Sequence, residues 1–191
     1  MFPPTRSRMP GERRLKNSEP VYVLDATPII HFAKVNRLTM ALSICQAYIT
    51  REVYKETVER GEGKPDALLI HDAIESGVLK LYDVRNRTSL AKFLRHTEIH
   101  LGEAETLAAA KELDAFAIID EAEARALAKT YGVKYRTGTL FLLFRLLALG
   151  KVNVNDCETV LDKLVQSGLY LDSTTLINAK NKIRSHVGKG K

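Results

Sequence analysis

The stretch Val-Tyr-Val-Leu-Asp-Ala-Thr-Pro at residues 21–28 decides the fold class of this chain. Its apolar run ends at an aspartate, and the threonine and proline that follow are both frequent at helix starts. The segment Phe-Ala-Ile-Ile-Asp at residues 116–120 repeats the change from an apolar run to an aspartate. Each apolar run has the length and composition of a buried strand, and a helix pattern follows each of them. We therefore predict that Asp25 and Asp120 lie at the carboxyl ends of two strands.

Strand and helix patterns alternate along the chain, and no hairpin turn joins two strands. Further short strands are predicted at residues 47–50, 78–84 and 133–135, with helices between them. This order predicts an α/β fold with a largely parallel sheet. Residues 153–167 and 173–186 predict two added amphipathic helices. In an open parallel sheet, ligands bind beyond the carboxyl ends of the strands, so both aspartates are expected near one site.

Length and composition are those of an ordinary globular protein. The chain has 191 residues, of which 45% are hydrophobic and 27% are charged, which is enough for one domain with extensions. The longest apolar stretch, residues 140–149, is too short to span a bilayer, and no apolar signal core opens the chain. Cys45 and Cys157 fit neither a metal-ligand spacing nor a disulfide framework. We expect a cytoplasmic protein without membrane association.

The formal net charge of +6 is concentrated at the two ends of the chain. Residues 1–18 carry five basic groups and one acid, and residues 178–191 carry five basic groups and no acid. We interpret residues 1–18 as a flexible basic arm, 19–152 as the main domain, and 153–191 as a helical extension with a basic tail. Basic arms can bind a polyanion by counterion release, although solubilising ends have the same composition.

Four acidic residues are predicted to gather at the carboxyl edge of the sheet. Asp25 and Asp120 follow strands, Glu56 lies in the helix after the second strand, and Glu103 opens a helix whose N-terminus favours a carboxylate. Uncompensated carboxylates raise one another's pKa, so a bound cation is their natural neutraliser. Oxygen ligands favour Mg²⁺ or Mn²⁺ over zinc. The pattern indicates metal-assisted hydrolysis of a phosphodiester.

These motifs resemble the PIN-domain ribonucleases, and most closely the branch of archaeal and bacterial proteins similar to VapC-type toxins. The segments Leu-Asp25-Ala-Thr27 and Val-Tyr-Lys-Glu56 resemble the family's first two acidic motifs. The segments Gly-Glu103-Ala-Glu and Ile-Asp120-Glu-Ala-Glu resemble the helix start and the strand-to-helix turn that carry the third and fourth acids. The similarity extends over about residues 20 to 170.

The resemblance implies a three-layer sandwich with a central, mostly parallel sheet, followed by C-terminal helices. It implies a metal-dependent endoribonuclease that uses Mg²⁺ or Mn²⁺ on single-stranded or structured RNA, as the toxin of a toxin–antitoxin pair. A homodimer and an antitoxin protein are the implied partners besides RNA. Carried over by motif, Asp25, Glu56, Glu103 and Asp120 would be catalytic metal ligands, and Thr27 would orient Asp25 or a bound water.

The sequence departs from the family pattern at two of the acids. The third acid is more often Asp than Glu, and the turn at residue 120 often reads Asp-Asp instead of Asp-Glu. Glutamate reaches one carbon further, which would place the metal differently or weaken its binding. The alternative hypothesis is therefore a catalytically weak PIN-fold protein that binds RNA or serves as a subunit of a complex.

Neighbouring residues leave several assignments open. Glu52, Glu105 and Glu121 are alternative ligands close to Glu56, Glu103 and Asp120 in the sequence, while Glu121 and Glu123 also suit a solvated helix start. His96 and His100 lack the metalloprotease spacing, so no zinc site is predicted. The aromatic residues are scattered and indicate no stacking platform. Five basic residues suit either an RNA groove or solvated surfaces: Arg85, Arg87, Lys92, Arg95 and Lys134.

Overall fold

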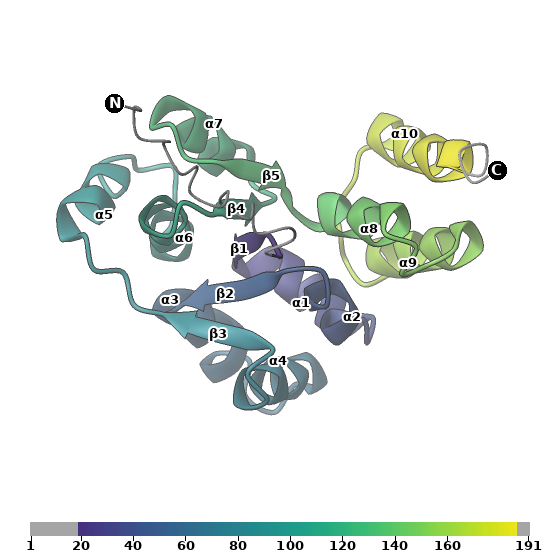
Figure 1. Cartoon of the computed structure of the whole chain (residues 1–191), viewed down its shortest axis with the longest axis horizontal. Helices are drawn as coiled ribbons and strands as arrows, with labels where there is room; N and C mark the ends of the chain where they lie inside the picture. Colours follow the sequence, from purple (N-terminus) through teal and green to yellow (C-terminus); the bar gives the residue numbers. More distant parts are fainter. Residues whose placement is uncertain (1–18, 187–191) are drawn as a thin grey trace, which may run out of the picture.

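A sheet of five parallel strands forms the centre of the fold in the computed structural model, which describes residues 19–186 (Figure 1). The strand order is β3-β2-β1-β4-β5, and all four pairings are parallel. The predicted arm at residues 1–18 and the last five residues of the predicted tail lie outside the described residues. The strands are β1 (Val21–Leu24), β2 (Gln46–Thr50), β3 (Leu79–Tyr82), β4 (Phe116–Ile119) and β5 (Tyr135–Thr137).

Helices cover both faces of the sheet, which confirms the predicted three-layer α/β architecture. Alternate residues of a strand point to opposite faces, so Tyr22 and Leu24 join one hydrophobic cluster while Val23 joins the other. The first cluster is closed by α1 (Ala26–Lys34), α2 (Leu38–Leu42), α4 (Pro65–Glu75), α8 (Gly138–Ala148), α9 (Val154–Gln166) and α10 (Ser173–Arg184). The second is closed by α5 (Arg87–Phe93), α6 (Leu101–Glu112) and α7 (Ala122–Thr130).

The direction of winding reverses at β1. From β1 the chain adds β2 and β3 on one side, and then crosses to add β4 and β5 on the other side. The register aligns Val23 of β1 with Ala117 of β4, so the two strands end together. The loops that leave β1 and β4 diverge there, which leaves space for a ligand between them. Asp25 and Asp120 are the first residues after these two strands.

The start of one helix and the presence of another differ from the sequence-based expectation. Helix α1 begins at Ala26, because Asp25 already takes the extended N-cap conformation that was assigned to Thr27. The short helix α2 was not predicted, since five residues carry too little periodicity to be recognised. After β2, the helix α3 (Arg51–Tyr54) continues into a π-helical turn, η1 (Lys55–Glu59), which contains Glu56. Such wider turns occur frequently at functional sites.

The C-terminal helices share the main hydrophobic core. Cys157, Leu161 and Leu164 of α9 and Ile183 of α10 are fully buried in the same cluster as β1 and α1. Figure 1 shows α8, α9 and α10 grouped at one end of the molecule, far from α5. Within residues 19–186, no helix has the length and apolar character that crossing a membrane requires.

We predict that Leu161→Ala lowers the free energy of unfolding by about 2–4 kcal/mol, because the fully buried side chain leaves a cavity between α9 and the sheet. Tyr170→Ala is the control, since this side chain is 88% exposed and its removal should change stability by less than about 0.5 kcal/mol. Urea unfolding of both variants measures the difference. Equal stabilities would show that α9 contributes nothing to the core.

Candidate active site

A pocket of about 470 Å³ opens where β1 gives way to α1, at the point where the winding of the sheet reverses. Four of the five predicted site residues line it: Asp25, Thr27, Glu56 and Glu103. Glu98, His100, Glu121 and Glu123 complete the polar part of the lining. The lining thus holds six carboxylates, and no lysine or arginine of the described chain is among them.

Asp25 is the most buried carboxylate of the pocket, with 4% of its surface exposed. Its backbone N–H donates to the carbonyl oxygen of Ile118 at 3.1 Å, which ties the end of β1 to β4. Burial raises the pKa of Asp25 from 3.8 to about 7, and the charges of Glu103, Glu56 and Asp120 add to this effect. Asp25 therefore carries a charge at neutral pH only at a cost, unless a cation compensates it.

Glu56 lies against Gly102, the second residue of α6, which leaves room for its carboxylate. A Cβ atom on Gly102 would lie 2.9 Å from Oε1 of Glu56, so any other residue at this position would displace the carboxylate. Arg60 lies 3.7 Å from Glu56, at the solvent side. Burial raises the pKa of Glu56, and Arg60 partly offsets the increase.

Glu52, the rival of Glu56 in the sequence, makes different contacts. Its carboxylate accepts a hydrogen bond from Nη2 of Arg60 at 2.6 Å and lies 3.5 Å from Nζ of Lys55. Glu52 is absent from the pocket lining. The two basic partners compensate its charge, so Glu56 is the better candidate ligand of the two.

Glu103 is buried at the N-terminus of α6, and its carboxylate accepts a hydrogen bond from the backbone N–H of His100 at 2.8 Å. Burial raises its pKa, although the hydrogen bond from His100 lowers it in part. Glu105, two residues further, instead accepts from the backbone N–H of Glu52 at 3.0 Å and so caps α3. The structure thus separates the two glutamates, and only Glu103 lines the pocket.

Asp120 is the one predicted ligand that does not line the pocket. Its carboxylate accepts hydrogen bonds from the backbone N–H of Thr139 at 3.0 and 3.1 Å and from Oγ1 of Thr139 at 2.7 Å. A Cβ atom on Gly138 would overlap this carboxylate, so the glycine provides its place at the N-terminus of α8. Asp120 is nevertheless close enough for its charge to raise the pKa of Asp25. Its role as a ligand stays a prediction.

Several lining residues were not assigned to the site from the sequence. Glu98 and His100 lie just before α6 in a segment read as a polar loop, where no spacing pointed to a site. Glu121, the alternative to Asp120 in the sequence, lines the pocket, and so does Glu123; both side chains are exposed, as in a solvated helix start. His96 Nε2 lies 2.9 Å from the hydroxyl of Tyr131 and is absent from the lining, so it does not pair with His100.

The donor atoms of the pocket suit a hard divalent cation. Carboxylate oxygens predominate, their charges are uncompensated within the lining, and burial holds the pKa of Asp25, Glu56 and Glu103 above ordinary values. In the part of the chain that the structure describes, no three Asp, Glu, His or Cys side chains converge closely enough to coordinate one ion as they stand. Asp25, Glu56 and Glu103 are the residues that would hold an ion.

Comparison with known proteins gives one family. A family model described as a PIN domain matches residues 21–185, which reaches from the first residue of β1 to the residue after α10. The match includes the whole acidic pocket and the helices α8, α9 and α10. A search of curated proteins finds no significant match.

We predict that Asp25→Asn stabilises the metal-free protein at pH 8 and not at pH 4. The folded-state pKa of Asp25, about 7, lies above its ordinary value of 3.8, so the folded protein binds a proton that the unfolded chain releases. Stability from this group therefore falls as pH rises from about 4 to about 7. The gain at pH 8 should be about 2–4 kcal/mol. Urea unfolding in EDTA at both pH values measures it, and equal differences at pH 4 and pH 8 would contradict the buried charge.

We also predict that Gly138→Ala is destabilising only while Asp120 is present. The added methyl group displaces the Asp120 carboxylate from Thr139, which costs about 1–3 kcal/mol. In an Asp120→Ala background the same change meets no carboxylate, and its cost should fall to nearly zero. A double-mutant cycle by thermal or urea unfolding measures the coupling. Additive effects would show that the two residues do not touch.

Proposed function

Because this chain belongs to the PIN-domain family, whose members are generally nucleases, we propose that it is a metal-dependent endoribonuclease that hydrolyses phosphodiester bonds of RNA. One observation carries the proposal: the buried carboxylate of Asp25 shares a pocket with five other carboxylates and no basic side chain of the described chain. Nucleases of this family typically use divalent metals, and the pocket has the oxygen donors that Mg²⁺ or Mn²⁺ prefers.

In this proposal each acidic residue has a defined part. Asp25, Glu56 and Glu103 would hold the ion, and we keep Asp120 as the fourth member because its charge reaches Asp25. When bound, the ion would supply a hydroxide at neutral pH and neutralise charge on the phosphate. Thr27, on the first turn of α1, lines the pocket and would orient Asp25 or a water.

Hydrogen bonds from the surrounding helices hold the carboxylates in place before any ligand arrives. The backbone N–H of His100 fixes Glu103, and the first residues of α8 fix Asp120. Groups that are oriented in advance need little rearrangement during the reaction. Both interactions use backbone N–H groups at helix N-termini, where the positive end of the helix dipole attracts a carboxylate.

The biological role that we propose follows from the sequence resemblance alone. The protein would act as the toxin of a toxin–antitoxin pair, cleave single-stranded or structured RNA, form a homodimer and be inhibited by an antitoxin protein.

A second candidate function is that of a PIN-fold protein that binds RNA, or serves in a complex, with little catalytic activity. The position of Asp120 favours it, since the carboxylate is engaged by Thr139 and absent from the pocket lining. The third acid also favours this candidate, because position 103 is a glutamate where the family more often has an aspartate. The two candidates make opposite predictions for turnover of RNA.

We predict that the full chain cleaves an end-labelled single-stranded RNA in Mn²⁺ or Mg²⁺ and is inactive in EDTA. Asp25→Asn should lower the rate at least about 100-fold, because it removes a charged ligand. Glu59→Gln is the matched control, since this exposed acid lies in η1 beside Glu56 and outside the pocket lining, and its rate should be unchanged.

A thermal shift measured in parallel separates the two candidates. Mn²⁺ should raise the melting temperature of the wild-type protein and of Glu59→Gln by several degrees, and that of Asp25→Asn by much less. RNA binding without cleavage and without a metal-induced shift would support the weakly active candidate. Cleavage that persists in Asp25→Asn or in EDTA would overturn the assignment of the site.

A further inference from the structure

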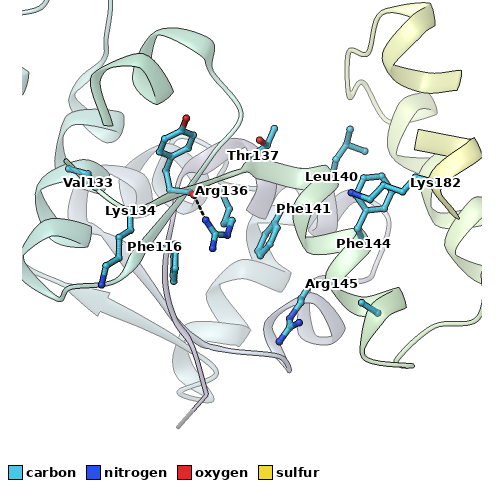
Figure 2. A pocket seen from close by; sticks show the side chains of 12 residues that line it. Phe116, Val133, Lys134, Arg136, Thr137, Leu140, Phe141, Phe144, Arg145 and Lys182 are labelled. Carbon is cyan, nitrogen blue, oxygen red and sulfur yellow. Dashed lines mark hydrogen bonds between the residues drawn. The ribbon is translucent and has the colours of Figure 1, made fainter. Parts of the chain in front are cut away.

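A second and larger hollow, of about 940 Å³, runs along the edge of the sheet beside β5 and α8 (Figure 2). We call it the β5–α8 groove. Strand β5 is the last strand of the sheet on this side, and the lining includes all three of its residues, Tyr135 to Thr137. The other wall is one face of α8, and Lys182 of α10 completes the lining at the far end. Nothing in the acidic pocket accounts for this feature, because the two linings have no residue in common.

The β5–α8 groove is basic. Its lining contains Lys134, Arg136, Arg145 and Lys182 and no acidic residue of the described chain. Lys134 forms an ion pair with Asp114, with 2.7 Å between Nζ and Oδ1. Among residues 19–186, the other three have no acidic partner within ion-pair distance. The groove therefore attracts an anionic ligand, in contrast to the acidic pocket.

Aromatic rings lie between the cations. Phe116, Phe141 and Phe144 line the groove, and all three are partly exposed. The guanidinium carbon of Arg136 lies 4.1 Å from the ring centre of Phe116 and 5.8 Å from that of Phe141. Nζ of Lys182 lies 4.3 Å from the ring centre of Phe144. Figure 2 shows Arg136 reaching toward the rings of Phe116 and Phe141, with Phe144 further along α8 and Lys182 of α10 beside it.

One end of the groove lies next to the residues that hold Asp120. Thr137, at the end of β5, is one of its lining residues, and Gly138 and Thr139 follow directly at the position that holds Asp120. The charge of Asp120 in turn reaches Asp25. An anionic polymer bound along the groove would thus be led toward the carboxylates, which by themselves repel phosphate. A basic site outside the acidic pocket is needed to hold such a polymer there.

We propose that the β5–α8 groove binds single-stranded RNA and positions it beside the acidic pocket; this rests on the proposed nuclease function. Stacking surfaces that alternate with cations match the alternation of bases and phosphates in a single strand. The guanidinium of Arg136 lies over the ring of Phe116, and this cation–π contact holds a charge and an aromatic surface together where a base could bind. The cations contribute contacts to the backbone that do not depend on sequence.

The test is fluorescence anisotropy with a labelled 12-nucleotide single-stranded RNA, the full chain, and EDTA throughout, so that binding is measured without cleavage. Arg136→Gln/Lys182→Gln should weaken binding at least about tenfold and make the dependence of log affinity on log salt shallower by about 1–1.5. Lys92→Gln/Arg95→Gln on α5 and the segment after it is the matched control, with the same loss of charge and little expected effect. It also tests the basic cluster that the sequence suggested for RNA.

Phe144→Leu tests stacking separately from charge. The variant keeps an apolar side chain of similar size but removes the aromatic ring on which a base can stack. RNA binding should therefore weaken at least about fivefold, while its salt dependence stays unchanged. Thermal unfolding of each variant checks that the fold is intact. A DNA strand of the same sequence and a blunt RNA duplex show whether the groove selects the sugar and the single-stranded state; tighter binding of the duplex would contradict the proposal.

Other occupants of the groove give different results. Equal loss of affinity in the control variant, or unchanged affinity in the groove variants, would overturn the proposal. A homodimer that dissociates in Arg136→Gln/Lys182→Gln would also overturn it, since the groove would then bind a second copy of the chain. The same holds for an acidic peptide that does not compete with RNA but fails to bind the groove variants. Because metal and cleavage play no part, a protein that binds RNA through the groove but never cleaves it would contradict only the nuclease proposal.

Discussion

The burial of the Asp25 carboxylate among other carboxylates is the constraint on which the site depends. A charged group that is almost completely removed from water is stable only with a compensating charge or a bound proton. The lining provides no such charge, and the pKa of Asp25 rises to about 7 as a result. The fold accepts this cost at the junction of β1 and α1, where the backbone of Asp25 also ties β1 to β4. A site in which a buried carboxylate has no compensating charge is suited to bind a cation.

Two glycines at helix N-termini let the acidic residues approach. Gly102 leaves room for the Glu56 carboxylate at the start of α6, and Gly138 leaves room for Asp120 at the start of α8. Each glycine therefore serves a contact between segments far apart in the chain, from η1 to α6 and from β4 to α8. The same helix starts provide the backbone N–H groups that hold Asp120 and the carboxylate of Glu103.

The described surface carries two hollows of opposite charge character. The acidic pocket lies at the reversal of the winding between β1 and β4, and the basic, aromatic β5–α8 groove lies one and two strands further along the same sheet. The first suits a cation and the second suits a polyanion. The net charge of the chain conceals this arrangement, because the excess of basic residues lies mainly in its two ends.

The sequence by itself determined the α/β class, the strands that end at Asp25 and Asp120, and the acidic character of the site, because periodicity and strand-end residues are local signals. Tertiary structure decided which carboxylates share the pocket: Glu56 faces it while Glu52 pairs with Arg60, and Asp120 turns to Thr139. It also brought together Phe116, Phe141 and Phe144, which looked scattered along the chain. The physical reason is that side-chain direction and long-range contacts depend on packing between helices, which spacing along one segment does not contain.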